Sequence, residues 1–223
     1  ANNLHDALQQ QGPFGLILSI LHVVQPNFGF ELSLNSDFAV GSGLGGSATL
    51  SAVVLGCFNK VRQDPWSQYE LAEIAFQAER LHLGIAGGWQ DQYAAVFGGF
   101  NFIEFYLDGN IVNPIRVHPD VVSEPEASLV LCDTGIEHHS GNIHEDQKST
   151  MASTTVKEMV DANVKLTYTI RNNLLRGNLE EFGECLDAAW QLKRNFSKMI
   201  SNNHLDDIYN GALANGALGG KLL

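Results

Sequence analysis

The chain has 223 residues, with 13 basic and 25 acidic side chains and a net charge of −12 when histidine is neutral. Hydrophobic residues make up 44% and charged residues 17%, a mixture typical of globular proteins with a proper core rather than of disordered chains. So few lysines and arginines argue against a nucleic-acid surface and against electrostatic docking on anionic membranes, because both need basic patches. An anionic ligand would have to be held locally, by backbone amides and a metal ion.

Three widely spaced cysteines, Cys57, Cys132 and Cys185, form no CxxC pair, which argues against a disulfide framework and a structural zinc site. The longest apolar stretch, 14–24, is too short to cross a bilayer. We therefore expect a soluble cytoplasmic protein. The chain opens without a methionine or a cationic leader and ends at Leu223, so we expect it to be a piece of a longer protein and not a complete enzyme.

The first expected element is a half-buried strand over 28–34, where apolar side chains alternate with polar ones. A glycine-rich turn follows at 41–46, and the apolar content of 47–59 predicts a mostly buried helix. Asp64 and Pro65 then predict the start of another helix, because aspartate caps helices and proline is tolerated in the first turn.

That next helix is expected to bury one face, since apolar residues recur at helical spacing at Leu71, Ile74, Ala75, Ala78 and Leu81. Glycines interrupt the pattern at 84–88, and a short helix is expected at 90–97. The sequence Asp108-Gly109-Asn110, which follows a run of phenylalanines, predicts a hairpin turn.

A second half is expected after Glu124-Pro125-Glu126, which divides the chain into domains 1–123 and 124–223. It would begin with a buried strand over 129–132 that ends at the turn 133–135. Long helical patterns follow at 145–175, 179–199 and 204–215. Strands and helices mix without regular alternation, so an α+β fold is preferred to a doubly wound sheet.

The most informative local feature is the sequence GSGLGGS at 41–47. Glycines let the backbone approach a ligand closely, and a helix that begins near Ser47 would point free amides and its positive dipole end at the same place. This combination suits a phosphate, although a plain structural turn remains open. The glycines also satisfy GxGxxG, a weak match to nicotinamide-dinucleotide loops, whereas the missing GKS or GKT excludes a Walker loop.

Two acids add a possible chemistry. Glu79 taken alone is a solvated helix residue, and Asp91 taken alone is an N-terminal helix charge stabilised by the dipole. Together with the loop and the Ser47 hydroxyl, they supply what magnesium-assisted phosphoryl transfer needs: amides for the phosphates, oxygens for the metal and an acid to orient the attacking alcohol.

At three ordered places the sequence resembles the GHMP family of small-molecule kinases. GSGLGGSAT resembles the family's second motif, AERLHLGIAGGWQDQYAAVFGGFNFIEF is similar to its sugar-kinase branch, and GALANGALGGKLL resembles the run into its third motif. The resemblance covers nearly the whole chain. It implies a GHMP kinase fold, with a ribosomal-S5-like N-terminal half and a ferredoxin-like C-terminal half, both cut short here.

The resemblance also implies roles for particular residues. The loop would wrap the phosphates of ATP, Ser47 and Glu79 would bind Mg²⁺, and Asp91 would act as base or orienter for the substrate hydroxyl. Gly46 replaces the usual second serine of the loop, and the family's first motif is not found in the chain. The implied ATP-binding residues are Gly41, Ser42, Gly43, Leu44, Gly45, Gly46, Ser47 and Ala48.

The implied function is an ATP- and Mg²⁺-dependent sugar kinase, most similar to those that phosphorylate the anomeric hydroxyl of D-glycero-D-manno-heptose 7-phosphate for nucleotide-heptose synthesis. The alternatives are a fucokinase or another sugar kinase of the family, a nicotinamide-dependent oxidoreductase and a catalytically silent sugar sensor. A small-molecule sugar or sugar phosphate is the expected partner, and a homodimer is possible.

Other residues carry weaker hypotheses. The spacing of His138, His139 and His144 fits no standard zinc site, so a polar loop is the preferred interpretation. On the last long helices, Trp190 is expected in the core, whereas Lys193 could reach a sugar phosphate. Arg80 is expected to be a solvated helix residue.

Overall fold

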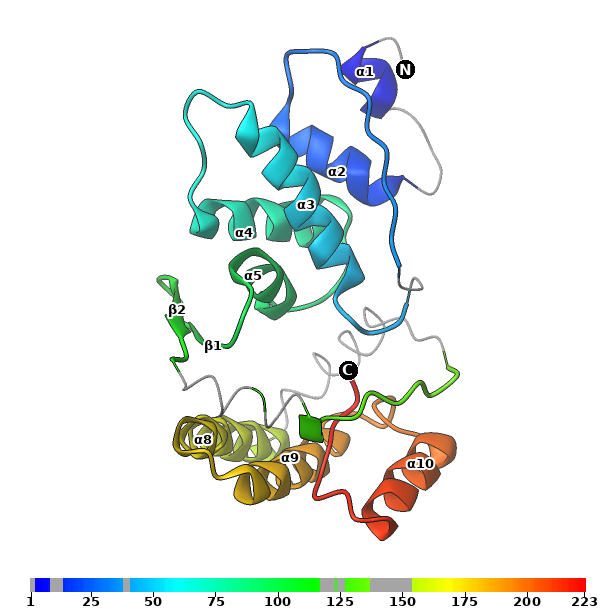
Figure 1. Cartoon of the computed structure of the whole chain (residues 1–223). Helices are drawn as coiled ribbons and strands as arrows, with labels where there is room; N and C mark the ends of the chain where they lie inside the picture. Colours follow the sequence, from blue (N-terminus) through cyan, green and yellow to red (C-terminus); the bar gives the residue numbers. More distant parts are fainter. Residues whose placement is uncertain (1–2, 9–13, 38–40, 117–122, 124–126, 137–153) are drawn as a thin grey trace. The chain divides into compact units, whose positions relative to one another are not determined.

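The computed structural model describes residues 3–8, 14–37, 41–116, 123, 127–136 and 154–223 (Figure 1). The chain divides into two compact units, Ala1–Asn113 and Pro114–Leu223. This division lies ahead of the boundary expected at 124–126, residues that fall outside the described part. The described elements are helices and one β-hairpin without regular alternation, in agreement with the predicted α+β class.

The first unit is a helical layer followed by the hairpin (Figure 1). Its core is formed by apolar side chains of α2, α3, α4 and the π-helix η1, and the side chains Ile20, Val54, Leu55, Ala75 and Ala78 are fully buried. The elements of this unit are α1 (Leu4–Leu8), α2 (Gly15–Val24), α3 (Gly46–Lys60), α4 (Gln68–Phe76), the π-helix η1 (Gln77–His82), α5 (Gln90–Phe97), β1 (Asn101–Phe105) and β2 (Asn110–Pro114).

Three predictions for this unit are confirmed. The helix after the glycine-rich turn is α3, which begins at Gly46 and buries Val54 and Leu55. The short helix after the glycine break is α5, Gln90–Phe97. The hairpin turn joins β1 to β2, and the Tyr106 amide donates to the Gly109 carbonyl at 3.0 Å.

The predicted start of the next helix is wrong. Helix α4 begins at Gln68, because Ser67 and Glu70 form a capping box: the Ser67 hydroxyl accepts from the Glu70 amide and the Glu70 carboxylate accepts from the Ser67 amide. This reciprocal pair satisfies two helix-end donors, which a cap at Asp64 could not match. The loop before α4 is held instead by Asn59, whose side chain accepts from the Trp66 amide and donates to the Trp66 carbonyl.

Replacing Ser67 by alanine should lower the free energy of unfolding by about 1 kcal/mol, the usual cost of losing an N-cap. Hydrogen bonds from the Ser67 amide and hydroxyl lower the pKa of Glu70. Because this folded pKa lies below the unfolded value, the stabilisation is present above the unfolded pKa and is lost as pH falls through the folded one. The Ser67 hydroxyl bond to the Glu70 amide does not titrate, so denaturant melts of Ser67→Ala and wild type should differ both near neutral pH and in acid. Glu70→Gln removes the titrating carboxylate, so its melts should differ from those of wild type near neutral pH and converge with them in acid. A Glu70→Gln gap that is equal at both pH values would contradict the capping box.

Leu81 is the member of the predicted apolar face that does not fit, since it is 69% exposed. After Phe76 the chain continues as the π-helix η1, whose wider turn shifts the side-chain register away from the α-helical spacing. Ala75 and Ala78 keep their buried positions, whereas Glu79 becomes buried instead. The π-turn therefore changes which side chains face the interior.

Both predicted strands outside the hairpin are wrong. Residues 28–34 are irregular, and Phe28 and Phe30 pack their rings on Phe58 of α3 while remaining partly exposed. Residues 129–132 are irregular and exposed rather than buried. A strand needs a neighbour for its backbone groups, and the only strands paired within the described ranges are β1 and β2.

The second unit contains α8 (Thr154–Arg176), α9 (Leu179–Arg194) and α10 (Asn203–Ala214). The predicted end of the first helix at Gly177 is confirmed, since this glycine has a φ of 72°. Helix α9 ends earlier than expected, at Arg194, because the chain turns at Phe196 and the Ser197 hydroxyl accepts from the Met199 amide. The part of the first predicted helix that precedes Thr154 lies outside the described residues.

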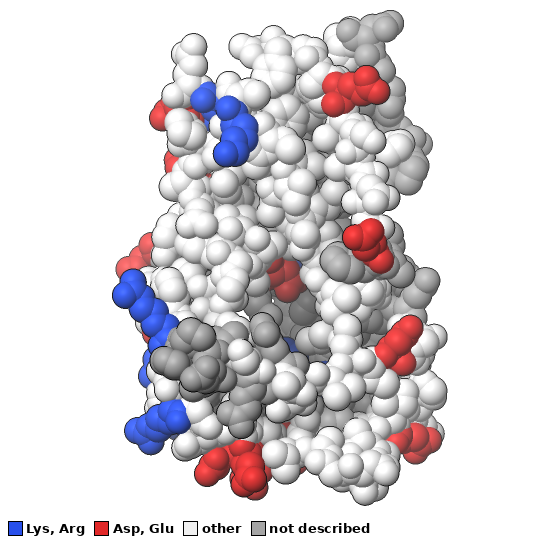
Figure 2. All heavy atoms as spheres, in the orientation of Figure 1, with Lys and Arg blue, Asp and Glu red and all other residues white. Residues whose placement is uncertain are grey.

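Charged side chains are spread thinly over the face drawn in Figure 2, where acidic and basic groups stand among a majority of uncharged residues. No helix in the described ranges is both long enough and apolar enough to cross a membrane.

Candidate active site

The glycine loop at 41–46 is shaped by backbone conformation rather than by crowding. Gly41, Gly43 and Gly45 have φ values of 80°, 76° and 70°, in the left-handed region that favours glycine. A Cβ at Gly45 would meet nothing within 4 Å, so the positive φ is the reason for glycine there. Helix α3 begins directly after this position, and no described side chain caps it. Its leading amides are therefore free to bind an anion such as a phosphate.

Glu79 lies at the centre of a buried hydrogen-bond network beneath this helix start. The residue is 2% exposed. Its Oε1 accepts from the Ser47 hydroxyl at 2.7 Å, and its Oε2 accepts from the Gln92 side-chain amide at 2.5 Å. The network thus joins the start of α3 to η1 and α5. The structure brings together the two residues that the sequence predicts as metal ligands, Ser47 and Glu79.

Arg80 is not solvated, so that expectation is wrong. Its side chain is 8% exposed, and Nη1 lies 3.4 Å from both Glu79 Oε1 and the Ala86 carbonyl oxygen. Its Nη2 lies 3.8 Å from Asp91 Oδ2. The π-turn carries Arg80 inward together with Glu79. One guanidinium therefore bridges the two carboxylates that the sequence predicts as functional.

Asp91 lies in the first turn of α5, as predicted, with its side chain 48% exposed. It reaches solvent, while its neighbours Gln92 and Tyr93 are fully buried. The Asp91 carboxylate is thus accessible to a ligand, and it also forms an ion pair with Arg80.

Aromatic packing fixes the start of α5 relative to α4. The Trp89 ring stacks on Phe76 with centroids 3.6 Å apart, and the Tyr93 hydroxyl lies 3.0 Å from the Asn110 side-chain nitrogen and 3.4 Å from Glu73. Burial raises the pKa of Tyr93, so this hydroxyl stays a protonated hydrogen-bond partner at neutral pH. Asp91 therefore lies on a helix that is fixed by the Trp89 stack and by the hydrogen bonds of Tyr93.

Sequence reasoning missed Arg80 and Gln92. A side chain at Gly87 would come within 2.5 Å of the Arg80 guanidinium carbon, so this glycine marks where the guanidinium packs. The glycine break at 84–88 was thus a usable sign of close packing as well as of a helix end. Nothing comparable in the sequence marks Gln92.

The oxygen donors fit a magnesium ion. A hydroxyl and a carboxylate are the hard ligands that Mg²⁺ prefers, and this ion commonly takes only one or two protein ligands besides phosphate oxygens and water. Among the described residues, no three histidine, cysteine, aspartate or glutamate side chains gather into a larger metal cluster. Ser47 and Glu79 therefore suit Mg²⁺ held jointly with a nucleotide.

Other candidates have simpler outcomes. Asp133 accepts from the Gly135 amide at 2.8 Å, which is the turn that the sequence allowed. Trp190 is 2% exposed and belongs to the core, as expected. The role of Lys193 stays a prediction, and the histidines at 138, 139 and 144 lie outside the described residues.

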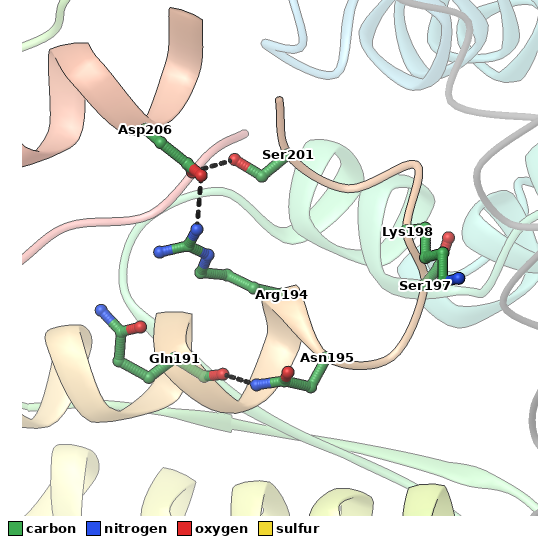
Figure 3. A pocket seen from close by; sticks show the side chains of 7 residues that line it. All are labelled: Gln191, Arg194, Asn195, Ser197, Lys198, Ser201 and Asp206. Carbon is green, nitrogen blue, oxygen red and sulfur yellow. Dashed lines mark hydrogen bonds and ion pairs between the residues drawn. The ribbon is translucent and has the colours of Figure 1, made fainter. Parts of the chain in front are cut away.

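The second unit holds a polar cavity of about 310 Å³ between the end of α9 and the start of α10 (Figure 3). Asp206 accepts from the Arg194 guanidinium and from the Ser201 hydroxyl, each at 2.6 Å. The carboxylate of Asp206 and the guanidinium of Arg194 therefore neutralise each other within the cavity. It is lined by Gln191, Arg194, Asn195, Ser197, Lys198, Ser201 and Asp206.

Comparison with known proteins places the chain in a class. Residues 15–99, which include the glycine loop, Glu79 and Asp91, match the GHMP kinases N terminal domain. This part of the chain is a GHMP kinase N-terminal domain, and the chain as a whole is similar to sugar kinases of that family.

Particular relatives are similar over most of the chain. It is 37% identical to the D-glycero-alpha-D-manno-heptose 7-phosphate kinase of Campylobacter jejuni, over 96% of this chain and 65% of that protein. It is 27% identical to the bifunctional fucokinase/GDP-fucose pyrophosphorylase of Arabidopsis thaliana, over 88% of this chain and 20% of that protein. The crystal structure of a D-glycero-D-manno-heptose 1-phosphate kinase from Bacteroides thetaiotaomicron matches with a TM-score of 0.66 and 29% identity, over 93% of this chain and 59% of that one. The chain thus spans less than two thirds of these relatives.

Proposed function

We propose that the protein is an ATP- and Mg²⁺-dependent sugar kinase that phosphorylates the anomeric hydroxyl of D-glycero-D-manno-heptose 7-phosphate. The observation that carries the proposal is the contact of Ser47 with buried Glu79 at the start of α3, with half-exposed Asp91 held near by through Arg80. The sugar is chosen from the 37% identity to the Campylobacter jejuni heptose 7-phosphate kinase. Its anomeric phosphate would serve nucleotide-heptose synthesis in the cytoplasm.

In the proposed reaction, the loop amides at 41–48 hold the phosphates of ATP at the positive end of α3. Ser47 and Glu79 hold Mg²⁺ with their side-chain oxygens. When bound, the ion neutralises charge on the phosphates.

Asp91 accepts a hydrogen bond from the sugar hydroxyl. This bond orients the hydroxyl oxygen toward the γ-phosphorus. As the new P–O bond forms, the bond from the γ-phosphorus to the bridging oxygen breaks and ADP leaves. The hydroxyl proton passes to an Asp91 carboxylate oxygen.

Fucose is the second candidate acceptor, because the chain is also similar to a bifunctional fucokinase, although at 27% identity. A silent sensor is disfavoured, since the Ser47–Glu79 contact is formed although Gly46 replaces a serine. A nicotinamide oxidoreductase loses its basis, because the GxGxxG segment lies within the part that matches a kinase domain.

The test is an acceptor screen with the purified complete gene product. ADP release should depend on D-glycero-D-manno-heptose 7-phosphate and on Mg²⁺, and should be much weaker with fucose, galactose or mevalonate. Phosphorus NMR of the product should show a second phosphate on the anomeric carbon. A preference for fucose would contradict the proposed substrate, whereas no ADP release with any acceptor would contradict a sugar kinase.

A further inference from the structure

We propose that Arg80 is a positioning residue for the kinase reaction: it sets the distance between Glu79 and Asp91, and Gly87 provides the space in which its guanidinium lies. The inference rests on the proposed function and deepens it, because it identifies what places the proposed base relative to the proposed metal ligand.

The first argument is the contact set of the guanidinium. Nη1 faces Glu79 Oε1 and the Ala86 carbonyl at 3.4 Å each, and Nη2 faces Asp91 Oδ2 at 3.8 Å. Two nitrogens of one rigid planar group thus face two different carboxylates. Arg80 therefore ties the distance between the two carboxylates to the width of a single guanidinium.

The second argument is the fit against Gly87. A Cβ added there would lie 2.5 Å from the guanidinium carbon of Arg80 and within 2.8 Å of both terminal nitrogens. The backbone of Gly87 is outside the left-handed region, so conformation does not require glycine. The next residue, Gly88, would meet nothing within 4 Å. A side chain would therefore collide with Arg80 at Gly87 but would meet no neighbour at Gly88.

A methyl group at Gly87 must therefore displace the guanidinium. Its Nε is buried and has no hydrogen-bond partner among the described residues, so the guanidinium is held through the contacts of Nη1 and Nη2. The contact with Asp91 is the longest of the three and is the first to be lost. Asp91 is half-exposed, so once released it can turn toward solvent.

The experiment compares Gly87→Ala with Gly88→Ala, its matched control, and adds Arg80→Gln alone and combined with Gly87→Ala. We expect Gly87→Ala and Arg80→Gln each to lower kcat at least tenfold, with the KM for ATP changed less than twofold. Gly88→Ala should behave as wild type. The double variant should be no slower than Arg80→Gln, because coupled residues are not additive. Equal kcat values for Gly87→Ala and Gly88→Ala, or additive losses, would overturn the inference.

Thermal melts of the same variants without ligand give a second readout that does not depend on activity. The shift in Tm caused by Gly87→Ala should shrink when Arg80 is already glutamine. If the wild type phosphorylates no acceptor, the proposed function fails and the positioning role fails with it, while the melts still decide whether Gly87 accommodates Arg80. If the wild type is active but the melts are additive, the positioning role alone is wrong.

Discussion

Replacing Asp91 by asparagine is expected to lower turnover by about 100-fold or more, the scale of lost acid–base assistance. Asparagine has nearly the same size and can still accept a hydrogen bond, but it cannot take up the proton of the acceptor hydroxyl. The Asp91 side chain is 48% exposed and lies in the first turn of α5, whereas the packing of that helix depends on buried Gln92 and Tyr93. The fold and the binding of ATP should therefore be preserved.

The measurement is kcat with the preferred acceptor, beside the affinity for ATP from a binding titration without acceptor. Asp64→Asn is the control, because Asp64 is an exposed aspartate of the same unit that does not cap a helix. We expect this variant to match the wild type in both quantities. A folded Asp91→Asn protein with near-normal kcat would falsify the assignment of Asp91 as the base.

The features that the sequence predicts correctly are those determined by neighbouring residues. The glycine loop depends on left-handed conformations that glycine adopts without strain, and Gly41, Gly43 and Gly45 adopt them. The hairpin depends on an Asp-Gly turn, and α5 follows directly from the end of a glycine break. Asp91 is placed correctly for the same reason, since its position in the first helical turn is a local property.

The features that the sequence predicts wrongly depend on distant residues. The alternation of apolar and polar residues at 28–34 is compatible with a strand, but a strand forms only beside a partner strand. The phenylalanines of this segment pack on Phe58 instead. Arg80 looks solvated at helical spacing, yet the π-turn directs it inward. It is held there by Glu79, by the Ala86 carbonyl and by Asp91 on the next helix, in space that a glycine seven positions later leaves open. Such placements require the tertiary structure.

Replacing Glu79 has the largest expected effect on stability, because three polar partners depend on its carboxylate. Glu79→Ala would leave Ser47 and Gln92 without their acceptor and would remove one of the two anions facing buried Arg80. Breaking a buried ion pair by removing one partner costs about 3 kcal/mol or more of the free energy of unfolding. Denaturant melts of Glu79→Ala should show such a loss, whereas Glu31→Gln, at an exposed glutamate, should show none.

Glu79→Gln separates this structural role from metal binding. Glutamine preserves the shape of the side chain and can still accept from Ser47, so the loss of stability should be smaller than with alanine. It removes the negative charge that attracts a cation, so the Mg²⁺ concentration for half activity at fixed ATP should rise about tenfold, a shift of about 1.4 kcal/mol. Ser47→Ala should shift the Mg²⁺ titration in the same direction by less, since it removes a neutral oxygen. If Glu79→Gln keeps the wild-type Mg²⁺ requirement while Glu79→Ala unfolds readily, the carboxylate is buried for packing alone and the metal is held elsewhere.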